Sequence, residues 1–335
     1  MYESLAQAVE HLTFNQVVRG SNPRCFTTEK HPEKGVFLLC NKYTKTFFGM
    51  IYCEQRIKQE EENFMDYKLL ILDIDGTVTN SEKVITPKTK EALLKLQEQG
   101  IPVAIASGRP PAGIAPIADE LELGRFGSYI LAFNGARIID WKTKECIYSK
   151  TLHPAFVKKL YRDAEKYHVN LMTYEDTQIL VGGKPDSYNE IEARITGLPI
   201  KQLEHLPDYV DFPVNKCILT GEPQDLERIE PILAEKYIHE AMVFRSEPFF
   251  LEVTPKNVDK AYCLARLLNI LRIPREAMVC CGDGFNDVTM IQFAGLGVAM
   301  ANAQDAVKKY ADYITASNDE DGVVQVVEKF FFREK

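Results

Sequence analysis

Apolar runs and polar stretches alternate along the chain, and the orderly part of this pattern begins near Met65. Short apolar runs of strand length lie at residues 69–74, 101–106 and 129–133. Between the first two runs, Thr86 and Pro87 are typical of a helix start, helically spaced leucines follow, and Gly100 is typical of a helix end. Strands that alternate with helices in this way predict a parallel sheet with crossover helices.

The pattern changes after Trp141 and returns near Lys260. In between, helices are predicted at 152–167 and 223–236, and strands at 170–181, 216–220 and 242–253. The first pattern then returns with a helix at 260–271 and an apolar strand at 277–281. We therefore expect an α/β fold in which residues 65–140 and 253–335 form a doubly wound parallel-sheet core, and residues 141–252 form an inserted α+β cap domain.

Composition and charge narrow the range of functions. The 335 residues are 45% hydrophobic and 26% charged, which is ordinary for a soluble protein with a sizeable core. The net charge of -8 and the lack of an evident basic patch argue against nucleic acid as a partner. No apolar run is long enough to span a bilayer, so no membrane association is expected. The eight cysteines include no C-x-x-C pair and are expected to be reduced, buried thiols of a cytoplasmic protein. No obligate protein partner is expected.

Polar side chains follow four of the predicted strands. The clusters are Asp73/Asp75/Gly76/Thr77, Ser107/Gly108/Arg109, Asn134/Gly135 and Asp283/Asn286/Asp287. Ligands bind beyond the carboxyl ends of parallel strands, so we expect these clusters to share one site. Asp73 and Asp75 lie on the same side of a strand, and two carboxylates so close together need a cation. Oxygen ligands without His or Cys suit Mg²⁺. A single strand-end Asp is more often a turn or helix cap, but four acids in two clusters are not readily explained in that way.

Four motifs in order resemble those of haloacid dehalogenase superfamily hydrolases. Asp73-Ile74-Asp75-Gly76-Thr77 is similar to the D-x-D-G-T signature, Ser107 to the second motif, Lys260 to the third, and Gly282-Asp283-Gly284-Phe285-Asn286-Asp287 to the fourth. The resemblance extends from Met65 to the C-terminus. Asn134-Gly135-Ala136 and the long insertion resemble most closely the Cof-like subfamily of sugar and small-metabolite phosphatases. The resemblance implies a Rossmann-like core and a Mg²⁺-dependent phosphatase that acts on a small phosphorylated metabolite, with a sugar phosphate favoured.

The resemblance also implies a role for each motif residue. Asp73 would be the nucleophile that forms an aspartyl-phosphate, and Asp75 the general acid and base. The residues expected to bind the phosphoryl group or the substrate are Ser107, Gly108, Arg109, Asn134, Gly135, Lys260 and Asn286. The residues expected to hold Mg²⁺ are Asp73, Asp75 through its backbone carbonyl, Asp283 and Asp287, the last of which would orient either Lys260 or a metal-bound water.

Several of these positions allow other interpretations. Lys256 is a rival for the role of Lys260, Arg109 could pair with a neighbouring acid instead of binding substrate, and Ser107 could be an ordinary helix cap. Asn134-Gly135 could be an ordinary turn. The cap residues that could contact substrate are Asn170, Tyr174, Glu175, Asp176 and Lys184.

Three other functions share features with this sequence pattern. A phosphomutase of the same superfamily would return the phosphoryl group to the sugar. A phospho-accepting receiver module also places acids and a lysine at strand ends, but the large insertion and the late acidic cluster argue against it. A nucleotide-binding dehydrogenase requires G-x-G-x-x-G after its first strand, where this chain has Asp75-Gly76-Thr77.

Residues 1–64 do not resemble this superfamily. Gly20-Ser21-Asn22-Pro23 is similar to the translation of the T-arm of a bacterial tRNA gene, and the surrounding residues have the same character. The hypothesis is that Met65 is the true start of the protein and that the upstream segment is poorly packed. The alternative is a genuine targeting or regulatory extension.

Overall fold

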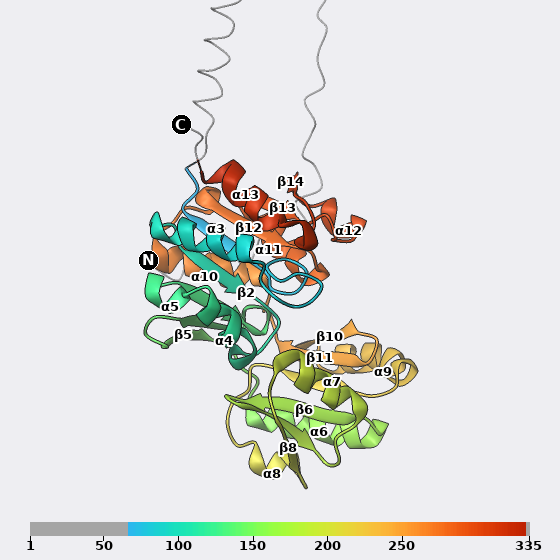
Figure 1. The fold of residues 1–335 in the computed structure, drawn as a ribbon. Coiled ribbons are helices and arrows are strands. Elements are labelled where there is room, and N and C mark those ends of the chain that lie inside the picture. The colour runs from blue at the N-terminus through green and yellow to red at the C-terminus, as the bar shows by residue number, and fades with distance from the viewer. Residues whose placement is uncertain (1–65, 333–335) are drawn as a thin grey trace, which may run out of the picture. The chain divides into compact units, whose positions relative to one another are not determined.

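The core of the fold is a sheet of eight strands in a computed structural model that describes residues 66–332 (Figure 1). Across the sheet the order is β14-β13-β12-β1-β2-β3-β4-β5. The strands are β1 (Leu69–Leu72), β2 (Val103–Ala106), β3 (Tyr129–Ala132), β4 (Arg137–Asp140), β5 (Cys146–Ser149), β12 (Met278–Gly282), β13 (Leu296–Ala299) and β14 (Tyr313–Ile314). From β14 to β3 all neighbours are parallel, and β4 and β5 continue the sheet antiparallel.

Helices cover both faces of this sheet. One face carries α3 (Pro87–Glu98), α4 (Pro111–Glu120) and α13 (Gly322–Phe330), and the other carries α10 (Lys260–Leu271) and α11 (Val288–Phe293). Short elements complete the core: α5 (Leu123–Phe126), α12 (Asp305–Lys308), η1 (Phe133–Gly135), η2 (Arg275–Ala277), η3 (Phe285–Asp287) and η4 (Asn318–Glu320). In β1, Leu70 packs on the first face and Leu69 on the second. A strand buried on both faces reads as a continuous apolar run, which confirms the predicted doubly wound α/β fold.

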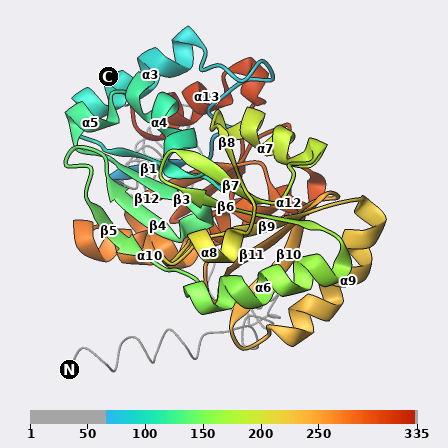
Figure 2. The same cartoon turned by 90° about the horizontal axis from the view of Figure 1, so that it is seen from below.

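A second sheet of six strands forms the inserted cap, with the order β10-β11-β9-β6-β7-β8. Its strands are β6 (Asn170–Glu175), β7 (Gln178–Gly182), β8 (Ile200–Leu203), β9 (Cys217–Thr220), β10 (Ala241–Glu247) and β11 (Phe250–Pro255), and its helices are α6 (Pro154–Tyr167), α7 (Ser187–Thr196), α8 (Leu206–Tyr209) and α9 (Pro223–Lys236). Helices α6 and α9 pack on one face of this sheet (Figure 2). Helix α7 contacts α4 of the core, so the opposite face of the cap sheet is directed toward the core.

The sheets divide the chain at slightly different residues from the predicted boundaries of 140/141 and 252/253. Strand β5 pairs with β4, so the core sheet extends to Ser149. Strand β11 pairs with β9, so the cap sheet extends to Pro255. The first difference arises because β5 is largely exposed and shows no apolar period. The predicted boundary at 252/253 falls inside β11, a strand that is buried along its whole length.

Two further predictions from the sequence concern the N-terminal segment and membrane-spanning helices. The expected poor packing of residues 1–64 lies outside the described residues. No helix between residues 66 and 332 combines the length and the apolar character that crossing a bilayer requires.

Candidate active site

The four polar clusters lie at one edge of the core sheet. Strands β12, β1, β2 and β3 are consecutive neighbours, and their shared direction brings their carboxyl ends together. Asp73 follows β1, Ser107 follows β2, Asn134 follows β3 and Asp283 follows β12. The strand order therefore brings together side chains that are far apart in the sequence, such as Thr77 and Asp283, which are 206 residues apart.

Lys260 is buried among the acidic side chains of this edge. Its Nζ lies 2.7 Å from Oδ1 of Asp73 and 2.5 Å from Oδ1 of Asp287, and the lysine is fully buried. Carboxylate oxygens of Asp73, Asp283 and Asp287 lie within 4.8 Å of one another. One ammonium group therefore faces three carboxylates, and the cluster carries excess negative charge.

The start of helix α10 positions Lys260. Asp259 is the N-cap, and its carboxylate accepts a hydrogen bond of 2.8 Å from the backbone N–H of Tyr262. Lys256, the rival in the sequence, donates its Nζ instead to the backbone carbonyl of Ile238 in the cap. The lysine that contacts Asp73 is thus the one favoured by the motif register.

Crowding of the carboxylates shifts their pKa values. Burial, followed by the charge of Asp287, raises the pKa of Asp73 to about 7. The same two causes raise the pKa of Asp283 to about 6. Burial acts to lower the pKa of Lys260, but Asp287 and Asp73 outweigh it and hold that pKa above its usual value. Both carboxylates would be stabilised in the ionised form by additional positive charge.

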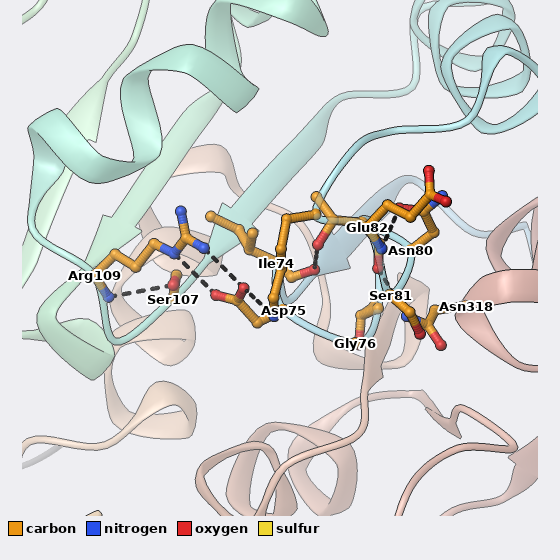
Figure 3. Close-up of polar contacts among 12 residues, drawn as sticks. Ile74, Asp75, Gly76, Asn80, Ser81, Glu82, Ser107, Arg109 and Asn318 are labelled. Atoms are coloured by element: carbon orange, nitrogen blue, oxygen red, sulfur yellow. Dashed lines mark hydrogen bonds and ion pairs between the residues drawn. The ribbon is translucent and has the colours of Figure 1, made fainter. Parts of the chain in front are cut away.

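Asp75 is directed toward Arg109 (Figure 3), and its carboxylate is not part of the cluster formed by Asp73, Asp283 and Asp287. Arg109 donates from Nε to Oδ2 of Asp75 at 2.9 Å and from Nη2 to Oδ1 at 2.7 Å, which is a bidentate pair. Lys83 adds a third hydrogen bond of 2.9 Å. Burial acts to raise the pKa of Asp75, but the hydrogen bonds and charges of Arg109 and Lys83 outweigh it and leave the pKa below its usual value.

The loop after β2 is held by its own side chain and by backbone hydrogen bonds. The backbone N–H of Arg109 donates to Oγ of Ser107 at 3.2 Å (Figure 3). The carbonyls of Ser107 and Arg109 accept from the N–H groups of Asn134 and Phe133 at 2.9 and 3.0 Å. Gly108 lies against the amide of Asn134, where a Cβ would meet Oδ1 at 3.2 Å. This close packing fixes the groups that the sequence predicts as hydrogen-bond donors to a phosphoryl group.

Two glycines permit close approaches that no other residue allows. Gly76 has φ +82°, and a Cβ there would lie 2.3 Å from Oδ2 of Asp283. Gly135 has φ +95°, and a Cβ there would lie 2.6 Å from Cβ of Cys263 in α10. Gly76 thus allows the first and fourth motifs to approach each other, whereas Gly135 serves helix packing.

Amide side chains connect the remaining motif residues. Asn286 donates from Nδ2 to Oδ1 of Asn134 at 3.0 Å, so both face the same edge of the sheet. Asn302, which the sequence reading missed, donates to the carbonyl of Gly76 at 2.8 Å and to Oδ2 of Asp283 at 3.3 Å. Asn302 follows β13, so the same strand-end rule that found the other clusters would have found it.

A cavity of about 270 Å³ lies between the core and the cap. Its lining residues are Pro111, Phe133, Arg137, Tyr174, Glu175, Asp176, Phe212, Pro213, Val214 and Asn215. Three of the five cap residues proposed from the sequence are therefore in this lining. The other two are elsewhere: Asn170 donates to the carbonyl of Lys184 and to the carboxylate of Asp186, near the N-terminus of α7.

The donor set at the sheet edge fits a hard divalent cation. Asp73 and Asp283 offer carboxylate oxygens close together, and a bound cation would offset the burial and the charge of Asp287 that raise the pKa values of both. Asp287 fits less well as a ligand, because Oδ1 accepts from Lys260 and Oδ2 accepts from the backbone N–H groups of Asp283 and Gly284 at 3.0 and 2.9 Å.

The contacts of four residues bear on the roles predicted for them. The carboxylate of Asp75 is outside the acidic cluster, because Arg109 and Lys83 hold it. Asp287 is engaged with Lys260 and the backbone, which matches the orienting role among its two predicted alternatives. Gly135 is buried, and a Cβ there would meet Cys263 of α10. For Arg109, the structure adopts the pairing with a neighbouring acid.

Comparisons with known proteins agree with this arrangement. A family model described as haloacid dehalogenase-like hydrolase matches residues 70–327. A solved haloacid dehalogenase-like hydrolase from Bacteroides thetaiotaomicron is 44% identical, with a TM-score of 0.77 over 79% of this chain and 100% of that chain. The sugar phosphatase BT4131 of HAD subclass IIB is 28% identical, with a TM-score of 0.68 over 78% of this chain and 98% of that chain. The 5-amino-6-(5-phospho-D-ribitylamino)uracil phosphatase YcsE of Bacillus subtilis is 30% identical over 265 residues, 78% of this chain and 95% of that protein.

Proposed function

This chain belongs to the haloacid dehalogenase-like hydrolase family, and on that premise we propose that it is a Mg²⁺-dependent phosphatase using Asp73 as its nucleophile. The phosphatase class follows from the family and from relatives that are phosphatases of small phosphorylated compounds. The single observation that carries the mechanism is the convergence of Asp73, Asp283 and Asp287 around the buried ammonium of Lys260.

In the first half of the reaction, a carboxylate oxygen of Asp73 attacks phosphorus. The bond from phosphorus to the leaving oxygen breaks, and Asp75 donates a proton to that oxygen. The raised pKa of Lys260 keeps its ammonium positively charged beside Asp73. The ammonium offsets the negative charge on the oxygens of the transferring phosphoryl group. The Ser107 hydroxyl and the Gly108 N–H add hydrogen bonds to the same oxygens.

In the second half, Asp75 takes a proton from water while the water attacks the aspartyl-phosphate. The bond between phosphorus and Asp73 breaks, inorganic phosphate leaves, and the carboxylate of Asp73 is restored. The ion pair with Arg109 favours ionised Asp75, which is the form this half of the reaction requires. The first half requires Asp75 to be protonated when the substrate is bound, so the ion pair with Arg109 has to loosen at that stage.

Mg²⁺ would be held by Asp73, Asp283 and the backbone carbonyl of Asp75, and when bound it supplies positive charge that screens Asp73 from an anionic substrate. The excess of carboxylates over ammonium groups in this cluster supports the proposal. Asp287 orients Lys260 from the opposite side.

A sugar phosphate is the proposed substrate class. The cavity beside the active site combines aromatic walls, such as Phe133 and Phe212, with hydrogen-bonding groups, such as Glu175 and Asn215. A compact polyhydroxylated leaving group suits this mixture. The subclass IIB relative is a sugar phosphatase, which supports the same class.

The cytoplasm is the proposed compartment. Four of the cysteines in residues 66–332 are both free and buried, namely Cys217, Cys263, Cys280 and Cys281. Burial raises the pKa of each of these thiols, so they behave as inert apolar side chains in a reducing environment.

A panel of phosphorylated sugars, nucleotides and cofactors, assayed for inorganic phosphate release with Mg²⁺, tests the function. We expect release from at least one sugar phosphate. Isomerised sugar phosphate without free phosphate would identify a phosphomutase instead. No release from any compound would contradict the proposal.

The nucleophile is tested with a matched pair of variants. Asp73→Asn should lower kcat by about 10³-fold or more, since the attacking carboxylate is lost. Asp163→Asn is the control, because Asp163 is also a buried aspartate with a lysine partner, Lys236, but lies in the cap. It should lower the melting temperature while leaving kcat near that of the wild type. Comparable loss of kcat in both variants would remove Asp73 from the mechanism.

A further inference from the structure

Two charged side chains are buried in the cap on the face of its sheet directed toward the core. Lys216, which precedes β9, is 3% exposed, and Glu252 in β11 is 6% exposed. Glu252 lies opposite Ile218 in the strand register, and Lys216 is two residues before Ile218. Because side chains two apart on a strand share a face, Lys216 and Glu252 are diagonal neighbours on one surface.

The ammonium of Lys216 makes one hydrogen bond within the cap and one with the core, and it lies 5.5 Å from the ring centroid of Tyr174 in the cap. Its Nζ lies 3.2 Å from Oε1 of Glu252 and donates to the backbone carbonyl of Gly108 at 3.3 Å. Oε2 of Glu252 has no hydrogen-bond partner among the described residues. A buried ion pair of this kind stabilises a fold little, because desolvation of both charges offsets their attraction. The pair is therefore poorly explained by the stability of the cap.

The contact with Gly108 completes a series of three carbonyls. The carbonyl of Ser107 accepts from the N–H of Asn134, and that of Arg109 accepts from the N–H of Phe133. Both of those donors belong to the core. The carbonyl between them accepts from Lys216, so the cap supplies the middle of three hydrogen bonds that hold the loop.

Fixing the Gly108 carbonyl also fixes the N–H on the other side of the same peptide group. A peptide unit is planar, so its carbonyl and the next N–H point in opposite directions. That N–H belongs to Arg109, and it donates to Oγ of Ser107. The hydrogen bond from the cap thus sets the orientation of the peptide that positions the Ser107 hydroxyl.

We infer that Lys216, held in place by Glu252, is a positioning residue that the cap contributes to the phosphoryl-binding loop Ser107–Arg109. This inference rests on the proposed function, because that function gives the loop its role. The cap then does more than cover the site: its packing against the core orders the groups that bind the phosphoryl oxygens.

The kinetic test compares Lys216→Met with Lys236→Met. Both substitutions remove an ammonium from the cap and keep the length of the side chain, but Lys236 pairs with Asp163 and is half exposed. Lys216→Met should lower kcat by about 10- to 100-fold with a smaller change in KM, since the loop is expected to act on the transition state. Lys216→Arg restores a donor and should recover part of the lost kcat. Lys236→Met should leave both constants near those of the wild type.

Hydrogen exchange gives a readout that does not depend on turnover. In the Mg²⁺-loaded protein, Lys216→Met and Glu252→Gln should speed amide exchange at Gly108 and Arg109, and Lys236→Met should not. Unchanged exchange and unchanged kcat in Lys216→Met would overturn the inference, as would faster exchange with unchanged kcat. If the wild type releases no phosphate, the proposed function fails, whereas unaltered exchange at the loop refutes the contact itself.

Discussion

Gly76 shows how much the active site depends on a single missing side chain. It combines a left-handed backbone with a position where a Cβ would lie 2.3 Å from Oδ2 of Asp283. Gly76→Ala should therefore lower the melting temperature and also displace Asp283, with a loss of activity of about 10²-fold or more. Thermal unfolding and phosphate release, measured on the same preparation, check both effects.

Gly100 provides the matched control for this substitution. Its φ of +85° is nearly that of Gly76, but a Cβ there would meet nothing within 4 Å. Gly100→Ala should cost about 1–2 kcal/mol of stability through backbone strain and leave kcat unchanged. Equal effects of the two substitutions on kcat would show that contact with Asp283 has no functional importance.

The sequence predicts side chains at strand ends well. It predicts poorly those side chains whose surroundings depend on how distant parts of the chain pack together. Asp73 and Asp283 are recognisable because each directly follows an apolar strand, and the order of parallel strands does the rest. Lys216 gives no such indication, since its burial depends on how the cap packs against Gly108. The close packing of Gly135 against Cys263 could not be predicted, because a glycine needed for helix packing looks the same in a sequence as one that approaches a ligand.

At the scale of elements, helix α10 carries Lys260, a proposed catalytic residue, at its first position, so its N-cap should affect activity. The carboxylate of Asp259 caps the helix through the N–H of Tyr262. Asp259→Ala should cost about 1 kcal/mol of stability and also lower kcat, because fraying of the first turn displaces Lys260 from Asp73. Thermal unfolding and kcat are the two measurements.

Helix α3 offers the corresponding control. Thr86 is its N-cap and accepts from the N–H of Thr89 at 3.1 Å, but α3 carries none of the proposed catalytic residues. The Thr86 hydroxyl also donates to Oδ1 of Asp321, so Thr86→Ala should lower stability by about 1 kcal/mol or more and leave kcat unchanged. A similar kcat for both variants would mean that the helix start does not position the lysine.

The sequence predicts elements with a strong apolar pattern, and it does not predict an exposed edge strand or a helix with few buried residues. Helix α10 has the predicted bounds, because an N-cap aspartate and an apolar face mark it clearly. Helix α7 was missed, since its short amphipathic pattern contains several polar residues and only three of its residues are buried. Strand β5 was missed because an exposed edge strand needs little apolar character.

At the scale of the whole molecule, one hydrophobic cluster joins the two sheets. Phe133 from the core and Tyr174 from the cap pack with ring centroids 5.4 Å apart, and both belong to the same cluster as the central strands. Helix α7 extends that cluster through Tyr188 and Ile191. Burial of this apolar surface stabilises the arrangement in which Lys216 reaches Gly108.

Stability of the whole protein should depend on Mg²⁺ in a way that identifies the ligands. A cation that binds only the folded state adds RT ln(1 + [L]/Kd), or about 2.7 kcal/mol at 100 times Kd. The wild type should therefore melt several degrees higher with Mg²⁺ than with EDTA, and EDTA should abolish activity reversibly. Differential scanning calorimetry and phosphate release are the measurements.

Asp283→Asn separates the role of the metal ligand from the role of charge. Burial and Asp287 disfavour ionised Asp283, so replacing it with a neutral amide should leave the Mg²⁺-free protein at least as stable as the wild type. With Mg²⁺ the order should reverse, because the variant has lost a ligand. Asp305→Asn, which changes an almost fully exposed aspartate, should keep the wild-type response to Mg²⁺. If Mg²⁺ stabilises Asp283→Asn as much as the wild type, Asp283 is excluded from the metal site. If the variant is the more stable protein without Mg²⁺ and the less stable one with it, the surplus of negative charge at this sheet edge is linked to cation binding.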